Sequence, residues 1–183
     1  MHYANIKTCD IANGPGVRTS LFVSGCTHRC PGCFNEIAWD FTCGEPFTPQ
    51  TEDSIIESVQ PAYITGLTLL GGEPMEPENQ HGLLLFLRRF RSLCPGKTVW
   101  CYSGYTWEQL TGRSPARCRC EITGDLLSLV DVVVDGPFIQ AQHDITLRFR
   151  GSANQRIIDV RRSLAAGEVV LWSDDPLYAS HSL

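Results

Sequence analysis

Residues 24–35 read Ser24-Gly25-Cys26-Thr27-His28-Arg29-Cys30-Pro31-Gly32-Cys33-Phe34-Asn35, with three cysteines in the spacing C-x3-C-x2-C. A structural zinc site takes four protein ligands in a closed tetrahedron. A [4Fe–4S] cube has four irons, so three thiolates leave one iron without a protein ligand. We therefore predict Cys26, Cys30 and Cys33 as ligands of a cluster whose open iron binds a substrate or cofactor.

The residues between the cysteines suit such a loop. Gly25 and Gly32 permit unusual backbone dihedral angles on either side, and Pro31 restricts the segment before the third thiol. We expect His28 to point away from the metal, because a fourth ligand would close the site. The alternative interpretation is a zinc knuckle or a set of buried thiols.

The rest of the chain alternates short apolar runs with amphipathic stretches. We predict strands at residues 20–23, 67–70, 98–102, 132–134 and 168–172, and helices at about 52–60 (capped by Thr51), 78–94 and 126–130. Strands separated by helices imply right-handed βαβ units and a mainly parallel sheet. Because 183 residues are few for an eight-unit barrel, we expect an open, partial α/β barrel. Residues 1–183 are expected to form one domain with an exposed tail from about residue 173.

Composition excludes some partners. The net charge of −5 provides no broad basic surface for nucleic acid or for an anionic membrane. The N-terminus lacks the apolar region of a signal peptide, and no run approaches a membrane span. Nine cysteines without a signal peptide favour a reducing compartment. We expect a cytoplasmic protein that binds neither nucleic acid nor membranes.

Several short runs occur in a fixed order, and all but the first and the last of them follow a predicted strand directly. They are Asn13-Gly14-Pro15-Gly16-Val17-Arg18-Thr19, the cysteine loop, Gly71-Gly72-Glu73-Pro74, Ser103-Gly104-Tyr105, Asp135-Gly136-Pro137-Phe138 and Arg150-Gly151-Ser152-Ala153-Asn154-Gln155. With these runs, residues 5–158 resemble the radical S-adenosylmethionine (SAM) enzymes. Within them the chain is similar to the activating proteins of the anaerobic ribonucleoside-triphosphate reductase, a glycyl-radical-generating family.

The resemblance implies a fold, cofactors and partners. The fold would be a partial radical SAM β/α barrel, and the cofactors a [4Fe–4S] cluster with one open iron and SAM. Reductive cleavage of SAM would release a 5′-deoxyadenosyl radical, which removes a hydrogen atom from a glycine of the reductase large subunit. A flavodoxin or ferredoxin would supply the electron. We predict no catalytic side chain, because hydrogen-atom abstraction requires no general base.

The resemblance also implies cofactor contacts. Gly71 and Gly72 allow a close backbone approach, and Glu73 would accept a hydrogen bond from the methionine amino group of SAM. Gly32, Cys33 and Phe34 are expected beside the cofactor. Phe34 would lie near the adenine, with a core contact as the alternative.

The ends of two later predicted strands supply further candidates for contacts with SAM. Ser103, with Tyr105, would contact the ribose or line the pocket, or else form a turn. Asp135 would contact the ammonium group or ribose hydroxyls of SAM, or else cap a turn with Gly136. Arg18 and Arg150 are candidates for a carboxylate contact or for docking of the protein substrate.

This chain is longer than short family members at residues 111–124 and beyond Ile158. Cys118 and Cys120, in the first extension, would be surface thiols or would have a metal or redox role. Three rival functions remain: an activase of another glycyl-radical enzyme, a small-molecule radical SAM enzyme, and a non-catalytic metal-binding interaction protein.

Overall fold

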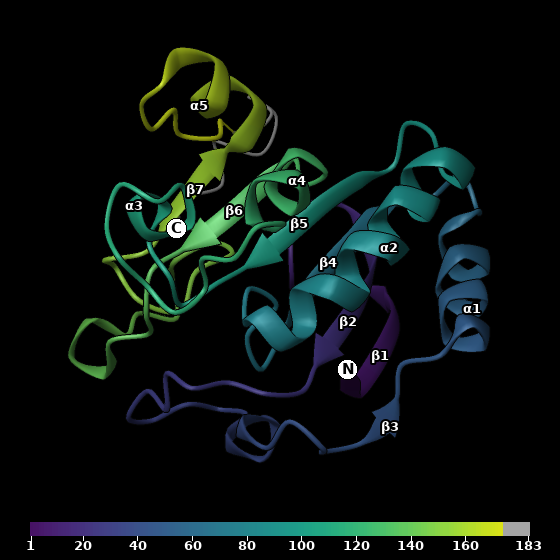
Figure 1. Cartoon of the computed structure of the whole chain (residues 1–183), viewed down its shortest axis with the longest axis horizontal. Helices are drawn as coiled ribbons and strands as arrows, with labels where there is room; N and C mark the ends of the chain where they lie inside the picture. Colours follow the sequence, from purple (N-terminus) through teal and green to yellow (C-terminus); the bar gives the residue numbers. More distant parts are fainter. Residues whose placement is uncertain (174–183) are drawn as a thin grey trace.

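The structure, a computed structural model, describes residues 1–173, and its strands join in one mixed sheet (Figure 1). The sheet order is β3-β1-β2-β4-β5-β6-β7. The strands are β1 (His2–Asp10), β2 (Val17–Val23), β3 (Glu45–Pro46), β4 (Ile64–Gly71), β5 (Thr98–Tyr102), β6 (Val132–Asp135) and β7 (Arg156–Asp159). Within residues 1–173, β3 and β7 are the two ends of this order and do not pair with each other, so the sheet is open.

The four central strands, β2, β4, β5 and β6, are parallel to one another. Strands β1, β3 and β7 are antiparallel and flank them. The prediction of an α/β fold with parallel strands is confirmed for the centre of the sheet, and the antiparallel edges were not predicted. The helices are α1 (Pro49–Val59), α2 (Pro77–Leu93), α3 (Trp107–Leu110), α4 (Thr123–Ser128), α5 (Val160–Ala166) and the 3₁₀ helices η1 (Glu36–Trp39) and η2 (Gln140–Gln142).

Alternation along the strands gives the sheet two different faces. One face carries Leu69, Val99 and Val133, which pack in a large apolar core with residues from all five α-helices. In Figure 1 helix α2 crosses in front of β4 on this side. The other face carries Trp100 and, beside it, a smaller apolar cluster. The five helices therefore cover one face and leave the other for the site.

Two predicted elements differ from the structure. The N-cap of α1 is Thr48, whose hydroxyl accepts a hydrogen bond from the Thr51 amide, so the prediction of Thr51 as the cap was wrong by three residues. Thr51 is instead the second partner of a capping box. The strand predicted at residues 168–172 is also wrong, since only Leu171 forms an isolated bridge, to Ile158.

The carboxyl ends of the parallel strands lie at one edge of the sheet. There β2 leads into the cysteine loop, β4 into residues 71–74, β5 into residues 103–105 and β6 into residues 136–138. Among the helices of residues 1–173, none combines the length and the apolar character needed to cross a bilayer. The predicted exposed tail lies outside the described residues, apart from Ser173.

Candidate cluster and cofactor pocket

A pocket of about 540 Å³ opens where the parallel strands end, and the sequence-predicted runs line it. This volume is within the usual range for small-molecule sites. Cys26, Cys30 and Cys33 all line the pocket. The loop that carries them thus presents its three thiols to one space.

The environment of Cys26 and Cys30 favours the protonated form of these two thiols in the absence of a metal. Burial, with the charge of Glu73 as the next cause, raises the pKa of Cys26 to about 12. Burial also raises the pKa of Cys30. A metal must displace these protons, so binding and deprotonation would be coupled. Within residues 1–173 no three His, Cys, Asp or Glu side chains converge closely enough to hold a single metal ion.

The glycines after β4 are required by close packing against the cysteine loop. The amide of Gly72 donates to the Val23 carbonyl at 2.7 Å, and the amide of Glu73 donates to the Gly25 carbonyl at 2.8 Å. A Cβ atom on Gly72 would lie only 2.5 Å from the Gly25 oxygen. Gly71 has a φ of +112°, a conformation that favours glycine. Both glycines line the pocket.

Glu73 lines the pocket but is almost fully buried, and the protein surrounds its carboxylate with donors. It accepts hydrogen bonds from the Met75 amide (2.9 Å), the Ser103 hydroxyl (2.9 Å) and the Gly104 amide (2.7 Å). These bonds join the ends of β4 and β5. A contact between Glu73 and an amino group of SAM stays a prediction.

His28 is turned toward Glu73. Its Nε2 lies 3.1 Å from a Glu73 oxygen, and its ring packs on Tyr105 with 4.3 Å between ring centroids. Burial alone would lower the pKa of His28, but the hydrogen bond to Glu73 and its charge raise that pKa above the ordinary value. The histidine therefore joins the cysteine loop to the Glu73 turn.

The other predicted cofactor residues fall into two groups. Gly32, Phe34 and Ser103 line the pocket, whereas Asp135 does not. Phe34 is 86% exposed, so the alternative of a core contact is wrong.

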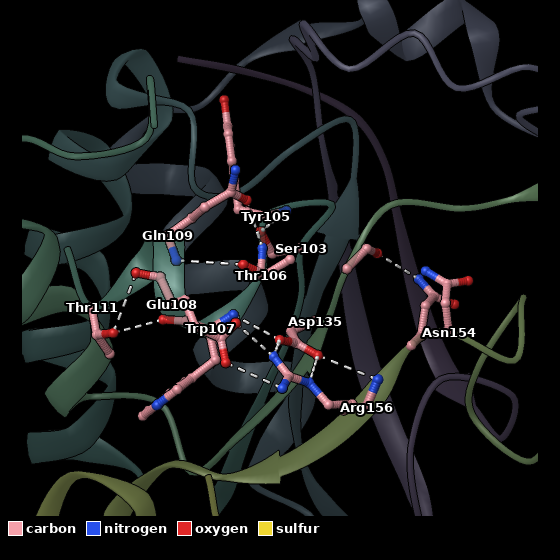
Figure 2. A network of polar contacts seen from close by, with 12 residues as sticks. Ser103, Tyr105, Thr106, Trp107, Glu108, Gln109, Thr111, Asp135, Asn154 and Arg156 are labelled. Carbon is pink, nitrogen blue, oxygen red and sulfur yellow. Dashed lines mark hydrogen bonds and ion pairs between the residues drawn. The ribbon is translucent and has the colours of Figure 1, made fainter. Parts of the chain in front are cut away.

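Asp135 is buried and instead forms an ion pair with the partly exposed Arg156, shown in Figure 2. Its carboxylate accepts from the Trp107 amide at 2.7 Å, at the start of α3, and from the Arg156 guanidinium at 2.5 Å. Arg156 also pairs with Glu108 at 2.9 Å. The hydrogen bond to Asp135, followed by that to Glu108, raises the pKa of Arg156. The contact of Asp135 with the cofactor stays a prediction, and its observed partners belong to α3 and β7.

The run at residues 150–155 fixes the loop that follows β6. The Gln155 amide group donates to the Gly136 carbonyl at 3.0 Å and accepts from the Gly151 amide at 2.8 Å. Asn154, labelled in Figure 2, donates to the Pro137 carbonyl at 2.8 Å. Because Gly136 and Phe138 line the pocket, this run shapes its wall.

Sequence reasoning missed two polar groups of the pocket. The Tyr102 hydroxyl and the Trp39 indole nitrogen are buried, line the pocket and have no hydrogen-bond partner within residues 1–173. The Nε of Arg150, a residue predicted as a candidate, shares these properties. A usable signal was the alternation of strand 98–102, which places Tyr102 on the same face as Trp100. Buried polar groups are normally satisfied, so these three donors are candidates for hydrogen bonds to a ligand in the pocket.

Arg18 lies away from the pocket, and its predicted role in a carboxylate contact or in docking is wrong. It is fully buried at the amino end of β2. Its guanidinium donates to the Thr68 hydroxyl (2.8 Å) and to the Leu67 (2.8 Å) and Thr98 (3.1 Å) carbonyls. Arg18 therefore ties β2, β4 and β5 together.

The extra cysteines also differ from expectation. Cys118 is fully buried in the main apolar core, so the expectation of a surface thiol is wrong for this residue. Cys120 is partly buried, with its sulfur 3.4 Å from a Gln80 oxygen.

The sequence of this chain matches a family of iron–sulfur proteins and a set of named relatives. Residues 12–158 match the family model described as "4Fe-4S single cluster domain". The anaerobic ribonucleoside-triphosphate reductase-activating protein of Escherichia coli (strain K12) is 39% identical over 163 residues, covering 88% of this chain and all of the relative. The protein of that name from Vibrio cholerae serotype O1 is 42% identical over 159 residues, covering 86% and 97%. The one from Enterobacteria phage T4 is 35% identical over 157 residues, covering 86% and 93%.

Proposed function

From the premise that this chain belongs to the family of anaerobic ribonucleoside-triphosphate reductase-activating proteins, we propose that its pocket is the site of a radical SAM activase that generates a glycyl radical on that reductase. The observation that carries the proposal is the shared pocket: three thiols, the Gly71-Gly72-Glu73 turn and the end of β5 face one cavity. The fold is then the partial radical SAM barrel, in one domain.

Cys26, Cys30 and Cys33 would hold the [4Fe–4S] cluster. The donor set fits, because three thiols from one loop line the same pocket and the histidine of that loop, His28, is engaged by Glu73. The family model for a single 4Fe-4S cluster spans this loop. When bound, the cluster and SAM supply one-electron cleavage of a sulfonium bond and, from it, removal of a hydrogen atom from glycine.

The chain's own residues bind and orient SAM. Residues 71–73 would approach it with the backbone, Gly32, Cys33 and Phe34 would lie beside it, and Ser103 and Asp135 would be further contacts. The unpaired donors of Trp39, Tyr102 and Arg150 would be satisfied by the carboxylate, hydroxyl and ring-nitrogen acceptors of SAM.

A protein substrate is supported by the rim of the pocket. Ile145 (89%), Phe34 (86%) and Ile11 (73%) are the most exposed large apolar side chains of residues 1–173. Phe34 lines the pocket, and Ile11 and Ile145 lie within two residues of others that do. Exposed apolar groups gathered at one place mark an interaction surface. We assign this rim to the reductase large subunit.

The remaining proposals concern the protein that donates the electron to the cluster and the cellular compartment of the chain. A flavodoxin or ferredoxin would dock near the cysteine loop and reduce the cluster. The nine cysteines and the oxygen-sensitive chemistry favour the cytoplasm.

The test reconstitutes the cluster anaerobically and adds SAM, a reductant and the reductase. We expect 5′-deoxyadenosine and a glycyl radical doublet in electron paramagnetic resonance. Cys30→Ala should abolish both products, whereas Cys9→Ala, which changes an exposed cysteine outside the loop, should retain both. Cleavage of SAM without a glycyl radical would reject the reductase as the substrate, and full activity of Cys30→Ala would reject the ligand assignment.

A further inference from the structure

A polar connection runs from the protein surface to the cysteine loop through the start of α2. Glu76, the residue before α2, is fully buried. One of its carboxylate oxygens, Oε1, accepts from the amide of Thr27 at 2.8 Å and from the Thr27 hydroxyl at 2.5 Å. Thr27 directly follows Cys26. Glu76 therefore holds the cysteine loop at its first ligand.

The other oxygen of Glu76 faces a cation. Oε2 lies 3.3 Å from Nε of Arg117, and within residues 1–173 it has no hydrogen-bond partner. The Arg117 side chain is 44% exposed and also pairs with Glu78 on α2. A buried carboxylate is costly unless a positive charge compensates it. Arg117 supplies that charge from the surface.

Arg117 is held in place by its neighbour. The carbonyl of the buried Cys118 accepts from the Gln80 amide at 2.6 Å and from the Thr123 hydroxyl at 3.0 Å. Gln80 and Thr123 are themselves buried. The segment that carries Arg117 is thus anchored on α2, one turn beyond Glu76.

The charge of Glu76 acts on the cysteine loop. Its Oε1 accepts the hydrogen bond of the Thr27 amide at 2.8 Å, directly after the first cysteine of the loop. Charges and hydrogen bonds around a cluster set its reduction potential. A carboxylate beside the loop without a compensating positive charge would disfavour reduction of the cluster. Removal of the carboxylate charge would favour reduction.

We propose that Arg117 and Glu76 form a positioning pair that fixes Thr27 in the cysteine loop and sets the reduction potential of the cluster bound there. The pair lies outside the pocket lining, so it acts through the loop and not by contact with SAM. The part that concerns the potential rests on the proposed cluster at the three cysteines.

The first test measures the midpoint potential of the reconstituted cluster by a redox titration followed by electron paramagnetic resonance. Arg117→Gln should shift the potential to more negative values, and Glu76→Gln should shift it to more positive values. Glu78→Gln is the matched control, because it removes the exposed partner of Arg117 and leaves Glu76 unchanged; its potential should stay at the wild-type value. Shifts of the first two variants in the same direction, or unchanged potentials, would overturn the proposal.

The second test needs no cluster and therefore separates this inference from the proposed function. Hydrogen exchange at the Thr27 amide is measured in the metal-free chain. Glu76→Ala should speed it by about tenfold or more, because a hydrogen bond to a charged acceptor is lost. Glu78→Ala should leave it unchanged, and amides of α1 report any global unfolding. An unaltered Thr27 rate in Glu76→Ala would refute the positioning role, even if the activase reaction is confirmed.

Discussion

At the scale of single residues, Tyr102 gives the sharpest test of the pocket. Its hydroxyl is buried and has no hydrogen-bond partner among residues 1–173, so its removal should leave the free energy of unfolding unchanged or raise it by up to about 1 kcal/mol. If the hydroxyl binds SAM, Tyr102→Phe should weaken SAM binding about five- to tenfold. Equilibrium binding to the reconstituted protein and urea unfolding measure the two quantities. Unchanged affinity would remove Tyr102 from the site.

Asp10 gives a prediction for pH. Burial alone would raise the pKa of Asp10, but hydrogen bonds from Ser20, Asn13, Ala12 and Lys7 outweigh it and lower the pKa to about 2. Because this is below the ordinary value of 3.8, the stabilisation is present above about pH 4 and is lost as the pH falls toward 2.

The contribution is on the order of 2 kcal/mol. The difference in unfolding free energy between wild type and Asp10→Asn should therefore shrink between pH 5 and pH 2. A difference that stays constant over that range would contradict the lowered pKa. Since Ala12 and Asn13 line the pocket, the same bonds fix part of its wall.

The pocket residues differ in how far the sequence could predict them. The cysteines share one loop, so their spacing alone indicated a joint role. The role of Arg18 could not be predicted in this way. Its run resembles a functional motif, yet its hydrogen-bond partners Thr68 and Thr98 lie 50 and 80 residues away along the chain. Asp135 is a similar case, since Arg156 reaches it only when β7 pairs with β6. Contacts of this kind depend on strand pairing, which a single sequence does not specify.

At the scale of elements, the cap of α1 is a direct test of the structure. Thr48 accepts from the Thr51 amide, and Pro49 occupies the first helical position, which suits proline. Thr48→Ala should cost about 1 kcal/mol of unfolding free energy, and Thr51→Ala should cost less because Thr51 accepts only a long 3.4 Å bond from the Thr48 amide. Urea unfolding of both variants decides the point. A larger loss for Thr51→Ala would restore the sequence-predicted cap.

The central strands were predictable because they are buried on both faces and read as continuous apolar runs. Strand β5 (Thr98–Tyr102) has the predicted bounds. Strand β1 was missed because most of its residues are only partly buried or exposed and show no clear alternation. Strand β7 has four residues and depends on pairing with β6. Edge strands are therefore harder to predict from the sequence than central strands, because they are less buried or shorter.

At the scale of the whole molecule, the topology concentrates the site. Parallel strands place the loops after β2, β4, β5 and β6 at one edge. Hydrogen bonds that Glu73 accepts, together with the contacts of His28 and Gln155, hold these loops in place. The helices cover the opposite face, so the pocket opens toward the exposed apolar rim. This arrangement suits an enzyme that must admit a segment of another protein.

The central claim is that three cysteines leave one iron open for SAM. Electron–nuclear double resonance on the reduced cluster, with SAM labelled by ¹⁵N at its amino group, tests that claim most directly. We predict a coupling between the cluster and the labelled nitrogen in the wild type, and none in Cys30→Ala. A reconstituted wild-type cluster that shows no coupling while SAM is bound would contradict the account.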